Sequence, residues 1–180
     1  MFYISDIYKT PPEEFKTPLQ EKTYAALQQL KIPFERVETD EAITMEDCIL
    51  INEKLDMKMV KTLFLCNRQK TLFFIYVTCG DKSFRSGEFS KAMNCSRVSF
   101  ASEDLFLEML GTKIGAATVF SALTDLDGDI HIAINQDVLL EEFYGCSDGT
   151  TTCYLKIKTS DIIQKFLPYV KHKPHIINIQ

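Results

Sequence analysis

A charged residue at the head of an apolar segment is the first candidate for chemistry in this sequence. Lys61 precedes the run from Thr62 to Cys66, where a buried position would normally exclude a charged side chain. At the start of a strand its ammonium group could point into a cleft beside the sheet and bind a phosphate or a carboxylate as a point charge. A solvated strand end would explain the same residues, so the residues alone leave both interpretations open.

A loop of small residues is the second candidate. It consists of Gly115, Ala116, Ala117, Thr118 and Val119. Small side chains leave backbone N–H groups accessible, and such groups suit an oxyanion or an ester carbonyl. Turns of small residues are common in proteins, so this loop is a weak signal when it is taken alone.

Cys146 is a weaker candidate for a nucleophile. It lies in a segment of small polar residues that we interpret as a loop, but no histidine stands near it in sequence to activate a thiol. The six cysteines form no C-x-x-C pair, and the N-terminus lacks the pattern of a signal peptide. We therefore expect reduced thiols in a cytoplasmic protein.

Three aspartates around a glycine resemble a calcium-binding loop. An EF-hand needs glycine at loop position six, whereas counting from Asp125 places Gly128 fourth. An Asp-Gly turn explains the segment from Asp125 to Asp129 better. With three scattered histidines and unpaired cysteines, we expect no metal site.

The elements that must position these residues alternate irregularly between helix and strand. Two strands around the polar break 66–70 predict a hairpin, and Thr17 and Thr44 are expected to cap the first two helices. The pattern predicts helices over 18–32, 44–55, 87–93, 102–110, 137–142 and 159–170, and strands over 34–38, 60–65, 71–77, 98–100, 119–123, 130–134, 152–157 and 175–179. This order indicates an α+β protein with a mixed sheet.

Composition limits the class of protein. The chain has 180 residues, 46% of them hydrophobic, and a net charge of −5. This length indicates a single domain, with residues 1–16 as an extended lead-in and connector. No segment approaches the roughly 18 apolar residues of a membrane span, so no membrane association is expected. The negative charge argues against a broad, non-specific binder of nucleic acids.

Three segments together resemble the YbaK/prolyl-tRNA synthetase-associated editing family. They are residues 61–70, 110–125 and 152–167, and weaker similarities extend the match over nearly the whole chain. Residues 1–180 are therefore identified as an aminoacyl-tRNA editing domain. Within the family, the sequence looks most similar to the free-standing Ala-tRNA(Pro) deacylases.

The resemblance implies a compact α+β fold around a mixed, barrel-like sheet flanked by helices. It implies a trans-editing hydrolase that deacylates mischarged tRNA, with Ala-tRNA(Pro) favoured, without a cofactor or a covalent nucleophile. Lys61 matches the lysine that holds the terminal adenosine and its phosphate, and residues 115–119 match the loop that lines the aminoacyl pocket. The partner is then the acceptor end of an aminoacylated tRNA, with prolyl-tRNA synthetase as a second candidate, and the oligomeric state stays open.

The sequence departs from the family pattern near the expected site. The family histidine falls on Ser147 and the family asparagine on Thr151, so these two residues are expected to contact the substrate in their place. Ile114 and Gly115 stand where a Pro-Gly pair often opens the loop, and Asn135 replaces an aspartate. Two alternatives therefore stay open: an altered amino-acid specificity, or a catalytically impaired homologue that binds tRNA or a synthetase.

The charge is unevenly distributed. Residues 101–142 hold nine acidic residues and one lysine, so the remaining chain is weakly basic. Two basic stretches stand out, Lys54, Lys58, Lys61, Arg68 and Lys70 in the first and Lys156, Lys158, Lys165, Lys171 and Lys173 in the second. Charge runs often mark only a solvated face. A protein that grips only the end of a tRNA nevertheless needs no more than a small basic rim.

Overall fold

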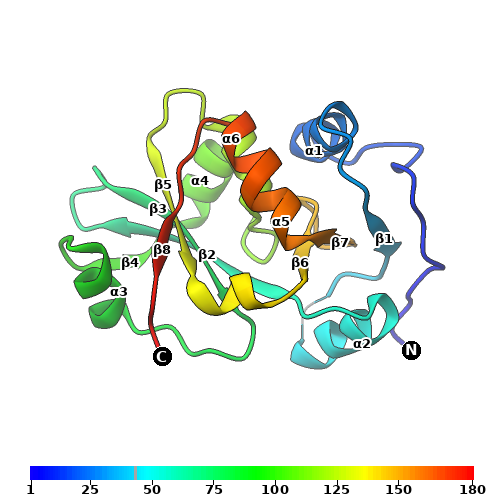
Figure 1. Cartoon of the computed structure of the whole chain (residues 1–180), viewed down its shortest axis with the longest axis horizontal. Helices are drawn as coiled ribbons and strands as arrows, with labels where there is room; N and C mark the ends of the chain where they lie inside the picture. The colour runs from blue at the N-terminus through cyan, green and yellow to red at the C-terminus, as the bar shows by residue number, and fades with distance from the viewer. Residues whose placement is uncertain (43) are drawn as a thin grey trace.

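Eight strands form two sheets in residues 1–42 and 44–180, the part of the chain that the computed structural model describes (Figure 1). The larger sheet has the order β4-β2-β3-β5-β8. In it β2 pairs antiparallel with β3 and β4, whereas β5 runs parallel to β3 and β8. The smaller sheet, β1-β7-β6, is antiparallel. The strands are β1 (Glu35–Glu38), β2 (Val60–Asn67), β3 (Phe73–Cys79), β4 (Val98–Phe100), β5 (Ile130–Asn135), β6 (Phe143–Ser147), β7 (Cys153–Lys158) and β8 (His175–Ile177). The predicted α+β class, mixed sheet and hairpin are confirmed.

The first two helices begin as the sequence predicts. Thr17 accepts a hydrogen bond from the N–H of Gln20, and Thr44 and Asp47 form a capping box. The helical segments are α1 (Pro18–Gln29), α2 (Met45–Leu55), α3 (Ser86–Met93), α4 (Glu103–Leu105) continued by the π-helix η1 (Phe106–Leu110), the 3₁₀ helices η2 (Val119–Thr124) and η3 (Gln136–Leu140), and α5 (Thr159–Asp161) continued by the π-helix η4 (Ile162–Phe166) and α6 (Leu167–Tyr169). Within the described residues, none of them is long and apolar enough to cross a membrane.

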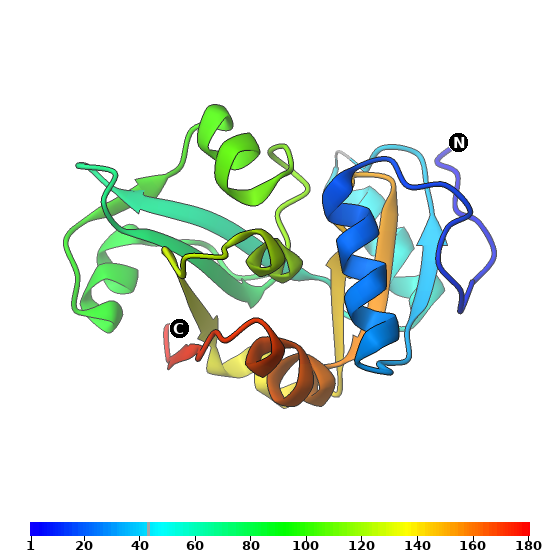
Figure 2. The same ribbon diagram turned by 90° about the horizontal axis from the view of Figure 1, so that it is seen from above.

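The main core fills the space between the two sheets. It joins Phe64 of β2 and Leu155 of β7 to Tyr24 of α1, and η2 and η4 close it with Phe120 and Phe166. The rings of Phe120 and Phe166 pack edge to face, with centroids 4.8 Å apart. Figure 2 shows this arrangement, with the larger sheet in one half of the molecule, the smaller sheet and α1 in the other, and η2 between them.

Each sheet also has a second covered face. Helix α3 inserts Phe89 against Phe74 and Tyr76 on the outer face of the larger sheet, and α2 packs Ile51 against Tyr154 on the smaller one. Successive residues of a strand point to opposite faces. The side chains of β2 therefore alternate between the main core and the cluster under α3.

The first 16 residues run along the edge strand β1. Ile4 and Tyr8 make isolated antiparallel bridges, to Thr39 and Arg36. The guanidinium carbon of Arg36 lies 4.8 Å from the centre of the Tyr8 ring, and Arg36 Nε donates to the carbonyl of Thr10 over 2.6 Å. This segment therefore covers the outer edge of the smaller sheet.

The two sheets meet at one end of β2. Met59 forms a parallel bridge with Gly145 of β6. A Cβ at position 145 would lie 2.7 Å from Sδ of Met57 and 3.0 Å from the carbonyl oxygen of Lys58. Glycine therefore suits this position, because a side chain would displace the end of Met57 and press on the carbonyl oxygen of Lys58. Beyond the bridge β2 and β6 diverge.

Two segments near this junction differ from the sequence prediction. Residues 119–123, predicted as a strand, form the 3₁₀ helix η2, whose start is held by Thr118 accepting from the N–H of Phe120. A short apolar run is compatible with either structure, so periodicity could not decide it. Residues 143–147, interpreted as a loop around Cys146, form β6 through pairing with β7. Phe143 and Tyr144 favour a strand and Gly145 disfavours one, and the long-range pairing with β7 decides the structure.

Replacing Gly145 with alanine tests the requirement for close approach. We expect Gly145→Ala to lower the free energy of unfolding by about 1–3 kcal/mol, because the new methyl group displaces the end of Met57 and presses on the carbonyl oxygen of Lys58. Gly87→Ala in α3 is the matched control, since a Cβ there meets nothing within 4 Å. That variant should be neutral or more stable by up to about 1 kcal/mol. Urea denaturation followed by circular dichroism measures both, and equal effects would contradict the explanation.

Candidate active site

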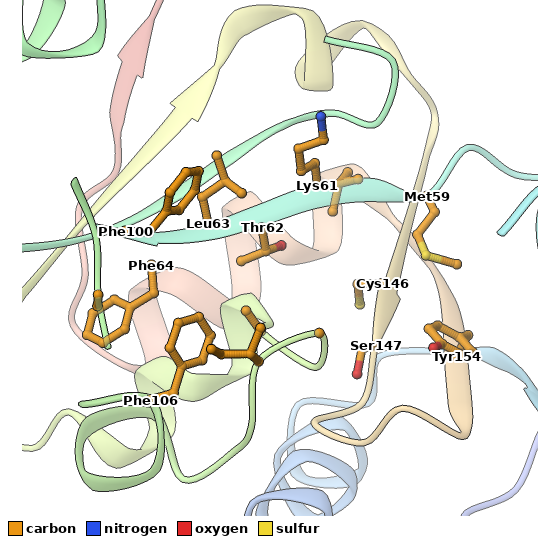
Figure 3. Close-up of a pocket in the computed structure, with 15 residues that line it drawn as sticks. Met59, Lys61, Thr62, Leu63, Phe64, Phe100, Phe106, Cys146, Ser147 and Tyr154 are labelled. Carbon is orange, nitrogen blue, oxygen red and sulfur yellow. The ribbon is translucent and has the colours of Figure 1, made fainter. Parts of the chain in front are cut away.

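A cavity of about 380 Å³ opens where β2 and β6 diverge (Figure 3). Residues from both sheets and from the loop before η2 surround it. The lining consists of Met59, Val60, Lys61, Thr62, Leu63, Phe64, Phe100, Ala101, Phe106, Ile114, Gly115, Ala117, Cys146, Ser147 and Tyr154. The cavity thus brings together Lys61, part of the small-residue loop and Ser147, which lie far apart in the sequence.

An open strand edge forms one wall. Strand β4 pairs with β2 only from Leu65 onward, and the last hydrogen bond on this edge runs from the N–H of Ala101 to the carbonyl of Phe64. The N–H and C=O of every second strand residue point to the same edge. Those of Thr62 therefore face the cavity, where no described strand continues the pairing.

Lys61 lies at the rim of the cavity with its side chain directed away from the floor. Figure 3 shows Lys61 and Leu63 on one side of β2 and Thr62 and Phe64 on the other, as strand alternation requires. The Nζ of Lys61 donates to the carbonyl of Lys82 over 2.5 Å. An ammonium group has three N–H bonds, so this contact fixes its direction and leaves donors for a ligand.

The small-residue loop presents only part of itself to the cavity. Gly115 and Ala117 line the cavity, whereas Ala116, Thr118 and Val119 are fully buried and do not line it. Gly115 adopts a φ of +94°, a conformation that favours glycine. The N–H of Ala116 donates to the carbonyl of Lys113. Within the described residues the N–H of Ala117 makes no backbone hydrogen bond.

The two substituted family positions, Ser147 and Thr151, have different surroundings. The hydroxyl of Ser147 donates to the carbonyl of Thr150 over 2.5 Å and accepts from the N–H of Gly149 over 3.0 Å. It thus closes a turn at the edge of the cavity. Thr151 does not line the cavity; its hydroxyl donates to Glu41 over 2.9 Å.

Glu41 connects this turn to the small-residue loop. Its carboxylate also accepts from the Nζ of Lys113 over 2.7 Å. The hydrogen bond from Lys113, and then that from Thr151, lower the pKa of Glu41. One carboxylate therefore ties the segment before Gly115 to the turn after Ser147.

Asp148 holds the same turn through its buried carboxylate. It is fully buried, and its carboxylate accepts from Gln20 Nε2 over 2.8 Å, from the Tyr24 hydroxyl over 2.7 Å, and from the N–H and hydroxyl of Thr150 over 3.2 and 2.8 Å. Burial and the charge of Asp148 raise the pKa of Tyr24, which keeps the phenol a donor. Sequence analysis missed this cluster, because its partners lie more than 120 residues apart.

Cys146 is not placed as a nucleophile. It is buried in β6, and burial followed by the charge of Asp148 raises the pKa of its thiol. No histidine is found among the residues that line the cavity. His172, the histidine with a carboxylate partner, lies elsewhere and pairs with Asp125 at 2.8 Å. Asp125 also accepts from the N–H groups of Asp129 and Ile130, so it closes its own turn.

Thr62 is a site residue that sequence analysis missed. The signal was present in the strand alternation, because residues 62, 64 and 66 share one face and only Thr62 among them is polar. A hydroxyl on an otherwise apolar inner face indicates contact with a polar group.

Known proteins resemble this chain in sequence and in fold. The family model of the aminoacyl-tRNA editing domain matches residues 39–165. The chain belongs to this family. The matched range contains β2, the small-residue loop, β6 and the Ser147 turn, so every wall of the cavity is part of the editing domain.

Two curated proteins are similar to this editing domain over most of its length. "Prolyl-tRNA synthetase associated domain-containing protein 1" of Danio rerio is 23% identical over 84% of this chain and 83% of its own. "Prolyl-tRNA editing protein ProX" of Acetoanaerobium sticklandii is 26% identical over 64% of this chain and 70% of its own. Both names refer to prolyl-tRNA, in agreement with the resemblance seen in the sequence.

Solved structures share the fold. One, described as a candidate trans-editing enzyme for prolyl tRNA synthetase, has a TM-score of 0.63 and 12% identity, over 92% of this chain and 100% of its own. Another, a scaffold from epitope backbone grafting by computational design, has a TM-score of 0.65 and 12% identity, over 91% of this chain and 99% of its own. At this identity the likeness shows the fold alone, and it confirms the expected editing-domain architecture.

Replacing Asp148 with asparagine tests how the turn is held. We expect Asp148→Asn to lower the free energy of unfolding by about 1–3 kcal/mol, because an amide N–H₂ would face buried donors. Asp127→Asn, in an exposed turn, is the control and should change stability by less than about 0.5 kcal/mol. Urea denaturation of both variants measures the difference. Equal stability of the two variants would show that the buried carboxylate does not hold the turn.

Proposed function

We propose that this editing domain, residues 1–180 with residues 1–16 as its lead-in, deacylates mischarged tRNA and that Ala-tRNA(Pro) is its substrate. The observation that carries the proposal is the cavity between β2 and β6, whose lining combines the open strand edge of β2 with Gly115 and Ala117 of the small-residue loop. Such a site can bind an ester through backbone groups, without a nucleophilic side chain. The names of the curated relatives support prolyl-tRNA as the class of substrate.

The proposed reaction is hydrolysis of the aminoacyl ester by water. The water oxygen attacks the ester carbonyl, assisted by the free 2′-hydroxyl of the terminal ribose, and the carbonyl–ribose C–O bond then breaks. The ribose oxygen takes up a proton, so alanine and uncharged tRNA are the products. The N–H of Ala117, next to Gly115, would stabilise the developing oxyanion.

Lys61 would hold the terminal nucleotide rather than attack the ester. Its ammonium group lies at the rim, on the side of β2 away from the floor, where a phosphate can reach it while the aminoacyl group enters the cavity. The carbonyl of Lys82 orients it. A lysine bound in this way acts as a positioned point charge for the phosphate.

Selection for alanine would be a size sieve, in which alanine enters and proline is excluded. Gly115 and Ala117 would form the narrow side of the sieve. Ala116, Thr118 and Val119 would act indirectly, because they hold the loop from its buried side. Ser147 would contact the substrate as part of the rim, and Thr151 would position the loop through Glu41.

The partner in this proposal is the acceptor end of tRNA(Pro), bound in the cytoplasm after it leaves prolyl-tRNA synthetase. The basic residues before and after the β2–β3 turn would meet its backbone. No cofactor takes part in the proposed reaction. The six cysteines are free thiols in this structure.

One observation favours a second candidate function, binding of tRNA without hydrolysis. The Ser147 hydroxyl is engaged in its own turn, so it does not offer the substrate the contact that a histidine would. Binding of uncharged tRNA together with no hydrolysis of alanyl, seryl, cysteinyl or prolyl esters would support this alternative. Hydrolysis of a different member of that panel would indicate altered specificity.

Replacing Lys61 tests the proposed hydrolysis. We expect Lys61→Ala to lower kcat/KM for Ala-tRNA(Pro) by about 10- to 100-fold, because a charge-assisted contact to the terminal phosphate is lost. Lys91→Ala, on the exposed side of α3, is the control and should stay within about twofold of wild type. Release of labelled alanine measures the rates. Equal rates for wild type, Lys61→Ala and a reaction without protein would refute catalysis.

A further inference from the structure

The Lys61 ammonium group depends for its direction on one carbonyl, that of Lys82. The Nζ of Lys61 donates to this carbonyl over 2.5 Å, on the side of β2 away from the cavity floor (Figure 3). The N–H of Lys82 donates to the carbonyl of Cys79 over 3.1 Å, which closes a turn after β3. From Lys82 to Arg85 the chain has no regular secondary structure. Backbone hydrogen bonds therefore hold this carbonyl from the β3 side alone.

The side chain of Lys82 supplies the contacts on the other side. Its Nζ pairs with the carboxylate of Asp137 in η3 and donates to the carbonyl of Ile179, after β8, over 2.9 Å. The side chain of Lys82 is 25% exposed and that of Asp137 is 36% exposed, so solvent screens the pair only in part. The hydrogen bond with Asp137 raises the pKa of Lys82, which keeps its ammonium group charged.

Both acceptors of Lys82 are themselves held by a buried amide. Asn135 Nδ2 donates to the same carbonyl of Ile179 over 2.9 Å and to the hydroxyl of Tyr76 over 3.2 Å. Its Oδ1 accepts from the N–H of Asp137 over 3.1 Å. Asn135 is fully buried, where hydrogen bonds are stronger than in water. The end of β5, η3 and the segment after β8 therefore form one support for the Lys82 side chain.

We propose that Lys82 and Asp137 position the Lys61 ammonium group for the phosphate of the terminal nucleotide without touching the tRNA themselves. The inference rests on the proposed function, in which Lys61 holds that nucleotide. A lysine side chain has much rotamer freedom, and fixing it before binding lowers the entropic cost of binding. The Lys82 carbonyl takes one of the three N–H bonds of Lys61 and thereby directs the other two. Lys82 and Asp137 are thus positioning residues.

Replacing Asp137 distinguishes positioning from a direct contact between Lys82 and the tRNA. Asp137→Asn keeps the charge of Lys82 but removes its ion-pair partner. We expect KM for Ala-tRNA(Pro) to rise by about three- to tenfold with kcat within about twofold, because only binding of the nucleotide is weakened. Asp81→Asn, an exposed acid next to Lys82, is the matched control and should not raise KM. An unchanged or lower KM in Asp137→Asn would indicate that Lys82 binds the phosphate itself and would overturn the proposal.

A double-mutant cycle tests whether Lys82 acts through Lys61. Lys82→Met should raise KM by about three- to tenfold, and it should have no further effect in Lys61→Ala, because no ammonium group is then left to position. Arg85→Met removes a positive charge from the same loop, where Arg85 forms an exposed ion pair with Glu88. This control should stay within about twofold of wild type. Additive losses from Lys82→Met and Lys61→Ala would assign Lys82 an independent role and overturn the proposal.

Chemical labelling of Lys61 separates this inference from the deacylase function. A lysine held by an acceptor must give up that hydrogen bond before its amine can react. Competitive acetylation with acetic anhydride, read by mass spectrometry, should modify Lys61 about threefold faster in Asp137→Asn and Lys82→Met than in wild type. Lys16, whose Nζ donates to Thr152 over 2.6 Å, is the internal control and should keep its rate.

The labelling result decides the positioning whether or not an ester is hydrolysed. Failure of the wild type to hydrolyse any ester would refute the deacylase function, while faster labelling of Lys61 in both variants would still support the positioning by Lys82 and Asp137. Unchanged labelling of Lys61 in both variants would overturn the inference. A parallel rise at Lys61 and Lys16 would indicate a general loosening of the fold and would overturn it as well.

Discussion

The bridge between Met59 and Gly145 sets the distance between the two sheets, and the cavity depends on it. At the bridge a Cβ on residue 145 would lie 3.0 Å from the carbonyl oxygen of Lys58, so the two backbones approach closely. Past it β2 pairs with β4 only from Leu65 onward and β6 pairs only with β7, so within the described residues each strand has an edge that no strand covers. In a closed barrel these edges would pair with each other. Here they separate, and the backbone of Thr62 becomes available to a ligand.

Two hydrogen-bonded carboxylates, Asp148 and Glu41, then hold the remaining walls. Asp148 takes hydrogen bonds from α1 and from its own turn, and Glu41 takes them from Lys113 and Thr151. The carboxylate of Asp148 is buried and is stable only when its oxygens are hydrogen-bonded, whereas the carboxylate of Glu41 is exposed. They hold the small-residue loop and the Ser147 turn on either side of the cavity. Hydrogen bonds from several elements therefore position the walls of the site.

Much of the fold follows from local sequence. The β2–β3 hairpin, the caps at Thr17 and Thr44 and the α+β order follow from periodicity and from side chains that bond within three residues. Lys61 and the loop that begins at Gly115 were recognisable as candidates because a charged residue before an apolar strand and a run of small residues are both unusual patterns. The structure places both at one cavity. The strand predicted over 119–123 was wrong, because a short apolar run fits a buried 3₁₀ turn equally well.

By itself, then, the sequence determined the elements, their class and the two segments that carry the site. Tertiary structure decided which atoms of those segments reach the cavity. It made a strand of the small residues around Cys146, turned the Lys61 ammonium toward the carbonyl of Lys82 and engaged the Ser147 hydroxyl in its own turn. The reason is the range of the interactions: caps and periodicity act over a few residues, whereas strand pairing and buried hydrogen bonds join residues that the sequence keeps far apart.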